Sequence, residues 1–251
     1  MERLDFLRIT GALSGSLMVG GITNVFAGDT RTIKAIAFDG FAIFDPRPVF
    51  NLAEEFFPGR GVELSNLWKT KQFEYTWLHN ITGTYINFYK VINNALTFAA
   101  KVLKIDLDDL KRQQLMLCYL NLKPWPDVAG ALQTLKASGV RLVILSNFTD
   151  EMLKKGIDHG QLQGVFEHCL STDKVKKFKP DPMAYQMAVD AFGLNKSEIL
   201  FVAFAGWDAA GAKQFGYKTF WSNRLGLPAE ELGAYPDATG KDLKDLLTYI
   251  G

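Results

Sequence analysis

Continuous apolar runs alternate with amphipathic helical patterns through most of this chain. The apolar runs cover residues 33–38, 141–145, 199–202 and 218–221. The helical patterns cover residues 127–138, 182–192 and 209–215, and each is followed directly by a glycine, the usual residue just past a helix end. Because the apolar runs are continuous rather than alternating, they predict parallel strands covered on both faces. The pattern therefore predicts an α/β fold with a Rossmann-like, doubly wound parallel sheet.

The stretch from residue 46 to residue 122 breaks this alternation. It contains no convincing strand, but it has helical patterns over residues 64–78, 88–103 and 106–120. We expect an all-helical cap domain over 46–122, inserted into a core domain made of residues 28–45 and 123–251. A cap inserted after the first strand would lie over the carboxyl edge of the sheet and close a pocket there.

Residues 1–27 predict an export signal peptide. Residues 9–27 carry no charge and end in Val25-Phe26-Ala27, the small or aliphatic pattern that a signal peptidase reads. The preceding segment resembles a twin-arginine signal with Leu4 in place of the second arginine. We expect a periplasmic protein without membrane association once the signal is removed. The alternative is a retained anchor, although the glycine and serine content is poor for a spanning helix.

Composition narrows the function classes. The chain has 251 residues, a hydrophobic fraction of 48% and a formal net charge of +1. These values are typical of a soluble globular protein and give no field that favours nucleic acid or anionic lipid. Cys118 and Cys169 have no CxxC or Cys/His neighbourhood, so a zinc site is not expected. Cys118 is expected to be a buried small hydrophobe, and whether the two cysteines pair stays open.

Polar side chains follow successive predicted strands. Asp39 follows the first strand, Ser146-Asn147 the next, Lys179 a short segment at 169–171, and Asp208 the run at 199–202. Ligands of open α/β sheets bind at the carboxyl ends of the strands, so these side chains predict a reaction centre. Lys179 close to Asp39 would favour the ionised carboxylate that a nucleophile requires. Asp181 and Asp208 could each instead be helix N-caps.

The order of these motifs resembles a known family. The sequences are Phe38-Asp39, Leu145-Ser146-Asn147, Lys179-Pro180-Asp181 and Trp207-Asp208, in the order found in the haloacid dehalogenase superfamily. Residues 67–78, LWKTKQFEYTWL, resemble the cap of its L-2-haloacid dehalogenases. Each short motif is weak alone, but their order together with the cap segment is specific.

The resemblance implies a hydrolase that cleaves the carbon–halogen bond of short 2-haloacids. Asp39 would displace halide and form an aspartyl ester, and water would then hydrolyse the ester. Ser146 and Asn147 would hold the substrate carboxylate or halide, Lys179 would pair with Asp39, and Asp208 would orient or activate the water. The resemblance implies no metal, no cofactor and no nucleic-acid partner, and it suggests a homodimer formed through the caps.

The resemblance also implies a set of substrate contacts. They are Gly40, Phe41, Lys69, Phe73, Phe88, Asn147, Tyr185 and Trp207. For the aromatic side chains Phe73, Phe88 and Trp207, ordinary core packing is the alternative interpretation.

This sequence departs from the family pattern at several positions. Lys69 stands in place of an arginine, Ala203 and Ala205 replace a serine and an asparagine, and Ala42 or Ile43 replaces a threonine. Losing polar partners from one network could stop ester hydrolysis. A non-catalytic protein that binds small carboxylates is therefore one alternative, and a hydrolase acting on another C–X bond through the same aspartate is a second.

A phosphatase of the same superfamily is a third alternative. Phosphatases of this superfamily carry a general acid two residues after the first aspartate and a second metal-binding acid near the last one. Phe41 and Phe204 occupy the corresponding positions here, and phenylalanine neither transfers a proton nor binds Mg²⁺. The two residues argue against this alternative.

Overall fold

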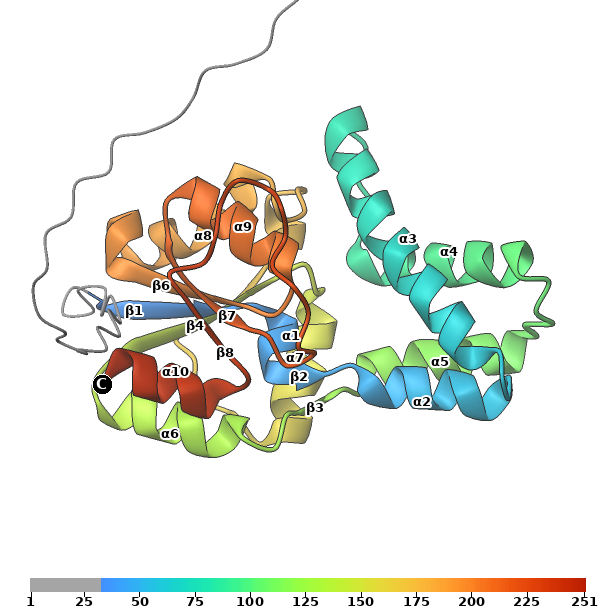
Figure 1. The fold of residues 1–251 in the computed structure, drawn as a ribbon, viewed down its shortest axis with the longest axis horizontal. Helices are drawn as coiled ribbons and strands as arrows, with labels where there is room; N and C mark the ends of the chain where they lie inside the picture. Colours follow the sequence, from blue (N-terminus) through green and yellow to red (C-terminus); the bar gives the residue numbers. More distant parts are fainter. Residues whose placement is uncertain (1–32) are drawn as a thin grey trace, which may run out of the picture.

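A parallel sheet forms the centre of the computed structural model, which describes residues 33–251 (Figure 1). The six strands lie in the order β5-β4-β1-β6-β7-β8, and all neighbouring pairs are parallel. Their bounds are β1 Ala35–Phe38, β4 Arg141–Ser146, β5 His168–Ser171, β6 Ile199–Ala203, β7 Lys218–Ser222 and β8 Ala238–Gly240. This confirms the predicted doubly wound sheet. The expected export signal lies outside the described residues.

Helices cover both faces of the sheet. Helices α8 (Pro182–Phe192) and α9 (Gly206–Phe215) lie on one face, and α6 (Val128–Ala137) and α10 (Leu243–Ile250) lie on the other (Figure 1). Alternate residues of β1 belong to two separate apolar clusters, with Ile36 and Phe38 in one and Ala35 and Ala37 in the other. The continuous apolar strand pattern thus arises because each strand is buried on both sides.

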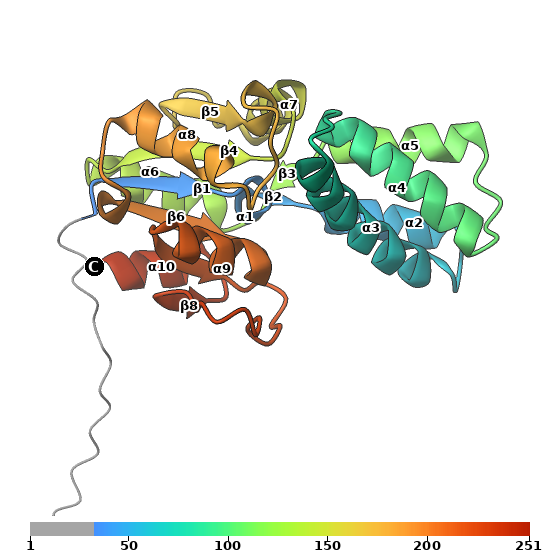
Figure 2. The ribbon, with the colours of Figure 1, turned by 90° about the horizontal axis from the view of Figure 1, so that it is seen from above.

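An all-helical unit projects beyond the carboxyl ends of the strands (Figures 1 and 2). Its helices are α2 (Arg47–Phe56), α3 (Gly61–Thr82), α4 (Phe88–Val102) and α5 (Asp109–Leu120). Side-chain caps define the starts of two of these helices, because Asn87 accepts from the Lys90 N–H and Asp108 from the Lys111 N–H. The unit is inserted between β1 and β4, as expected for a cap, and we call it the cap below.

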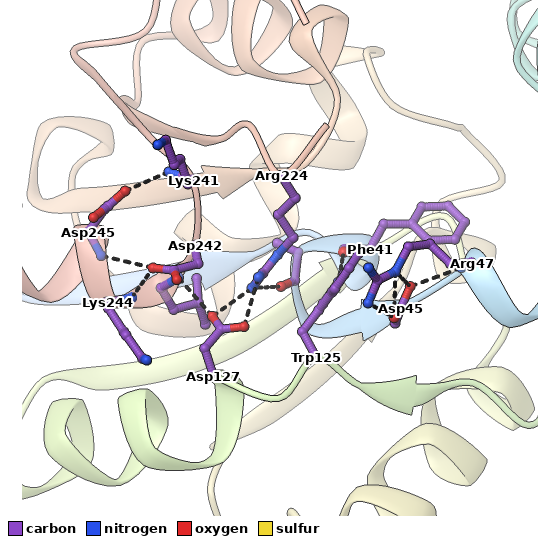
Figure 3. A network of polar contacts seen from close by, with 12 residues as sticks. Phe41, Asp45, Arg47, Trp125, Asp127, Arg224, Lys241, Asp242, Lys244 and Asp245 are labelled. Carbon is purple, nitrogen blue, oxygen red and sulfur yellow. Dashed lines mark hydrogen bonds and ion pairs between the residues drawn. The ribbon is translucent and has the colours of Figure 1, made fainter. Parts of the chain in front are cut away.

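Two short linkers connect the cap to the core. β2 (Phe44–Asp45) pairs antiparallel with β3 (Lys123–Pro124), and Trp125 follows directly. The indole of Trp125 lies between the guanidinium groups of Arg47 and Arg224, 4.5 and 4.7 Å from its ring (Figure 3). Its Nε1–H donates to the Phe41 carbonyl at 3.0 Å, and Arg224 pairs with Asp127 at 2.8 Å. The linker therefore packs directly against the short helix α1 (Gly40–Ile43), which follows Asp39.

Several element boundaries differ from the pattern-based expectations. The sequence pattern missed α2, α7, β8 and α10, and it began the helix after β6 at residue 209, whereas α9 begins at Gly206. Three further elements are short: α1 (Gly40–Ile43), a 3₁₀ turn at Thr172–Lys174 and another at Lys196–Glu198. Helix α7 (Asp150–Gly160) follows β4 and begins at the Thr149 N-cap. These differences leave the order of the strand ends unchanged.

The two cysteines are free thiols, and each is only partly buried. Cys118 packs at the edge of the apolar core rather than inside it. Among residues 33–251, none of the helices combines the length and the apolar character that a membrane crossing requires.

Candidate active site

Three buried charged side chains meet at the carboxyl ends of β1 and β6. The Lys179 ammonium lies 2.6 Å from Asp39 Oδ1 and 2.5 Å from Asp208 Oδ2. Lys179 and Asp208 are each 1% exposed, and Asp39 is 6% exposed. Burying a charge is costly unless it is paired, so the two carboxylates depend on Lys179 and Lys179 depends on them.

The electrostatics of this centre follow from burial and pairing. Burial alone would lower the pKa of Lys179, but the Asp208 and Asp39 carboxylates raise it above its usual value, so the amine stays protonated. Burial raises the pKa of Asp208 to about 6, repulsion from Asp39 adds to this shift, and attraction to Lys179 opposes it. Asp208 is therefore an acid that titrates much closer to neutrality than an exposed aspartate.

The backbone after β1 aims the carboxylate of Asp39. Asp39 is the N-cap of α1, and its Oδ2 accepts from the Phe41 N–H at 3.0 Å. Gly40 lies so close to Ser146 that a Cβ atom there would be 2.5 Å from the serine Oγ. A side chain at position 40 would thus displace Ser146. Asp39 lines the space above the strand ends, whereas Gly40, an expected substrate contact, is not among the lining residues.

Asp208 lies inside a helix rather than at its cap. The N-cap of α9 is Ala205, so the N-cap alternative for Asp208 is wrong, whereas Asp181 does cap α8 by accepting from the Met183 N–H. Asp208 sits in the first turn of α9, where the helix dipole favours a carboxylate. Its Oδ1 accepts from the Tyr185 hydroxyl at 2.7 Å, which fixes its second oxygen.

Tyr185 holds Asp208 rather than contacting the cavity. Its side chain is fully buried and does not line the space above Asp39. Burial, and then the charge of Asp208, raise the pKa of the Tyr185 phenol well above its usual value. The predicted substrate contact of Tyr185 therefore differs from its observed place, which is one layer behind the cavity.

Ser146 and Asn147 line the same cavity from the end of β4. Asn147 Oδ1 accepts from the Lys179 N–H at 2.9 Å and from the Thr172 hydroxyl at 3.3 Å. Its Nδ2 group makes no hydrogen bond with any residue of the described range, so both of its protons remain for a ligand. The Ser146 Oγ accepts from the Phe148 N–H at 3.1 Å, which leaves its own proton to donate.

Aromatic side chains enclose the space above these polar groups. Those that line it are Phe41, Phe73, Phe88, Phe148 and Trp207. Phe73 comes from α3 of the cap, and its ring lies 5.1 Å from that of Trp207 in the core. The volume of this cavity is only about 10 Å³. The reaction pocket, as we call it below, is thus small, apolar above and charged below.

Lys69 lies outside the reaction pocket. Its amine stands 4.7 Å from the centre of the Phe50 ring, beside an adjoining cavity, and burial lowers its pKa. The family resemblance predicted that Lys69 contacts the substrate carboxylate or halide, whereas the structure places Lys69 outside the reaction pocket. Phe148 and Ala205, in contrast, line the pocket but were not among the expected contacts. Phe148 directly follows the Ser146-Asn147 pair, which is the one sequence signal that could have indicated it.

The two alanines that depart from the family pattern have different surroundings. Ala203 is fully buried at the end of β6, whereas Ala205 lines both the reaction pocket and the adjoining cavity. Neither side chain can supply a hydrogen bond. The polar contacts of Asp208 come instead from Lys179 and Tyr185.

Fold and site together define a capped parallel sheet with an Asp–Lys–Asp centre at its strand ends. The family model of the haloacid dehalogenase-like hydrolases matches residues 28–216. The chain is 42% identical over 210 residues to haloacetate dehalogenase H-2 of Moraxella sp. (strain B), covering 83% of this chain and 94% of the relative. It is 44% identical over 206 residues to an (S)-2-haloacid dehalogenase of Pseudomonas sp. (strain YL), covering 82% and 89%.

A solved structure agrees with these sequence matches. The L-2-haloacid dehalogenase of Xanthobacter autotrophicus with chloropropionic acid covalently bound is 30% identical and superposes with a TM-score of 0.79. The match covers 87% of this chain and 98% of that one. The chain belongs to the haloacid dehalogenase-like hydrolase family.

Proposed function

We propose that this protein is an (S)-2-haloacid dehalogenase that removes halide from short 2-haloacids without a metal. The observation that carries the proposal is the Asp39 carboxylate, held by Lys179 at 2.6 Å and facing a pocket with aromatic walls. The substrates named for the relatives from Moraxella and Pseudomonas support the same substrate class.

In the first step, an oxygen of Asp39 attacks the C2 carbon of the substrate. A C–O bond forms, the carbon–halogen bond breaks with inversion at C2, and the electron pair leaves with the halide. The free protons of Ser146 and Asn147 hold the substrate carboxylate. The apolar walls keep water away, so the carboxylate is less solvated and more reactive than in water.

In the second step, water attacks the Cγ carbon of the Asp39 ester. Asp208 lines the pocket and accepts the proton of the water, while the Lys179 ammonium balances the charge that develops. The ester bond breaks, the 2-hydroxyacid leaves, and the Asp39 carboxylate is restored. The net reaction consumes one water and releases one halide and one proton.

The same centre argues against a metal-dependent phosphatase. Phe204 stands at the position of the second metal-binding acid, and its side chain cannot coordinate a cation. The Phe41 ring packs against Phe148 and Phe204, with ring centres 4.7 and 5.9 Å away, and offers no proton to a leaving group.

Halide release from the two enantiomers of 2-chloropropionate tests the proposal. We expect release from the (S) enantiomer, retention of activity in EDTA, and an adduct on the Asp39 peptide by mass spectrometry. The variant Asp39→Asn should lower release by at least about 10³-fold, since an amide is a poor nucleophile. If no short haloacid gives either halide or adduct, the protein is a binding relative rather than an enzyme.

We further propose that the protein works in the periplasm. The support is the uncharged stretch at residues 9–27 and the family match, which begins at residue 28. Cell fractionation and mass spectrometry of the mature amino terminus test this proposal. A cytoplasmic protein that retains residues 1–27 would contradict it.

We also propose a homodimer formed through the caps. Several cap side chains are apolar and exposed, including Leu78 and Ile81 one turn apart on α3, and Phe98 and Val102 one turn apart on α4. Light scattering on the purified protein should give twice the chain mass. Ile81→Lys should shift it toward monomer, and a monomeric wild-type protein would contradict the proposal.

A further inference from the structure

A second cavity adjoins the reaction pocket at the junction of cap and core. Its walls come from the cap, from the linker and from the core loops after β6 and β7, and they include Phe50, Gln72, Trp125 and Leu225. The volume of this cavity is about 120 Å³, whereas that of the reaction pocket is about 10 Å³ on the same measure. The larger empty space therefore lies beside the nucleophile rather than directly above it.

The two cavities share three wall residues. Phe41, Phe73 and Ala205 line both of them. Ala205 is the smallest of the three, and its single methyl group fills less of the boundary between the cavities than a larger side chain would. A ligand whose C2 carbon lies over Asp39 can therefore extend past Ala205 into the second cavity.

The second cavity is apolar in its chemistry. Gln72 and Tyr119 hydrogen-bond to each other at 3.1 Å, and Arg47 pairs with Asp45 at 2.7 Å, so these polar groups already have partners. The Lys69 amine lies over the Phe50 ring, 4.7 Å from its centre, and Lys69 is also a wall residue. Such a surface favours a hydrocarbon group over a polar one.

We propose that the second cavity receives the hydrocarbon substituent of 2-haloacids longer than chloropropionate. This inference rests on the proposed function and specifies its substrate class. A cavity of roughly 150 Å³ in another protein holds one benzene ring, so this one has room for about four carbon atoms. The substrates it fits best are straight-chain 2-haloacids such as 2-chlorohexanoate.

The chain-length dependence of kcat/KM tests the inference. Each methylene that enters an apolar site contributes about fourfold, so kcat/KM should rise about fourfold per carbon from 2-chloropropionate to 2-chlorohexanoate and then level off. Halogen-free alkanoates of the same lengths provide a second readout, since their affinity, measured by calorimetry, should follow the same trend without any reaction.

Leu225→Trp should narrow the second cavity. It should lower the ratio of kcat/KM for 2-chlorohexanoate to kcat/KM for 2-chloropropionate by about tenfold. Leu227→Trp is the matched control, because Leu227 is as exposed as Leu225, at 54% against 53%, but does not line the cavity. The control should keep the wild-type ratio. Thermal unfolding of both variants checks that each is folded.

The outcomes separate this inference from the proposed function. Halide release that does not increase with chain length overturns the inference and leaves the dehalogenase intact. Affinity that rises with alkanoate length, without halide release, supports the cavity and overturns the dehalogenase. Lys69→Met gives a third arm, because an equal loss for all chain lengths would place the carboxylate in the second cavity and overturn the inference.

Discussion

The reaction pocket and the second cavity lie side by side, but different interactions form them: buried charges in the first and apolar packing in the second. The floor of the reaction pocket consists of the buried charges Asp39, Lys179 and Asp208, which depend on one another. The second cavity consists mainly of aromatic and aliphatic walls, in which Gln72 and Tyr119 are hydrogen-bonded to each other and the Lys69 amine lies over the Phe50 ring. From this difference we infer that the buried charges of the reaction pocket determine the reaction, while the shape of the second cavity determines the size of the substrate.

The largest combined effect on stability and activity should follow from Lys179→Met, which leaves two carboxylates buried without their cation. Removing one member of a buried ion pair costs about 3–5 kcal/mol of unfolding free energy, and halide release should fall by about 10²–10³-fold. Denaturant unfolding and ion chromatography measure the two effects. Lys177→Met is the matched control, because the Lys177 side chain is 28% exposed and lies 3.7 Å from its carboxylate partner. A stable, active Lys179→Met protein would show that charge does not fix this pocket.

The next effect concerns Asp208 and pH. Asp208 must be ionised to accept a proton from water, so turnover should rise with pH and level off above its pKa of about 6. Esterification removes the charge of Asp39 and its repulsion, so the rise in kcat should lie somewhat below that pH. Asp208→Asn should lower turnover by about 10²–10⁴-fold, accumulate the ester and lose the rise. Asp181→Asn, which keeps a good N-cap residue, is the control. Persistence of the rise in Asp208→Asn would assign it to another group.

Tyr185→Phe should have a smaller effect of the same kind. Its hydroxyl stabilises the ionised Asp208 through a 2.7 Å hydrogen bond, so its loss should raise the pKa of Asp208. Losing a hydrogen bond to a charged group shifts its pKa by roughly one unit. The rise of turnover with pH, the acidic limb of the profile, should therefore move to higher pH by about that amount. Tyr217→Phe loses a bond to the Tyr185 backbone carbonyl instead, and should leave the limb in place. If the rise of turnover occurs at the same pH in Tyr185→Phe as in the wild type, Tyr185 does not control the pKa of Asp208.

The smallest effect should come from Arg47 in the linker beside the second cavity, and Asp127 in the same linker provides the comparison. The Arg47–Asp45 pair is exposed on the arginine side, at 58%, whereas Arg224 and Asp127 are 5% and 9% exposed. Arg47→Gln should therefore lower the unfolding free energy by less than about 1 kcal/mol. Asp127→Asn should lower it by about 3 kcal/mol, because it weakens the contact of a buried arginine. Similar losses in the two variants would contradict this ranking.

The sequence was sufficient to predict the parallel sheet, the inserted cap and the meeting of Asp39, Lys179 and Asp208. The strands are continuous apolar runs, and parallel strands bring their carboxyl ends to one edge, so chain order alone locates these residues. Short or irregular elements were harder to predict. Strand β8 has only three residues, including Gly240, and α2 begins beside prolines.

The places of Lys69 and Tyr185 could not be read from the sequence. Lys69 is on α3, and which face of that helix meets the core depends on how the cap packs, which a local pattern does not determine. Tyr185 is one helical turn beyond Asp181, but its ring points inward to Asp208 rather than into the pocket. The second cavity arises from five segments that are distant in the sequence, and no motif marks it.

A single turnover in water labelled with heavy oxygen tests the central claim most directly. Excess protein is mixed with (S)-2-chloropropionate in this water, and both the product and the Asp39 peptide are analysed by mass spectrometry. Because water attacks the Cγ carbon of the ester, the label should appear in the Asp39 carboxylate while the first lactate formed stays unlabelled. Label in the lactate and none in the peptide would show that water attacks the substrate directly, and would contradict the covalent account.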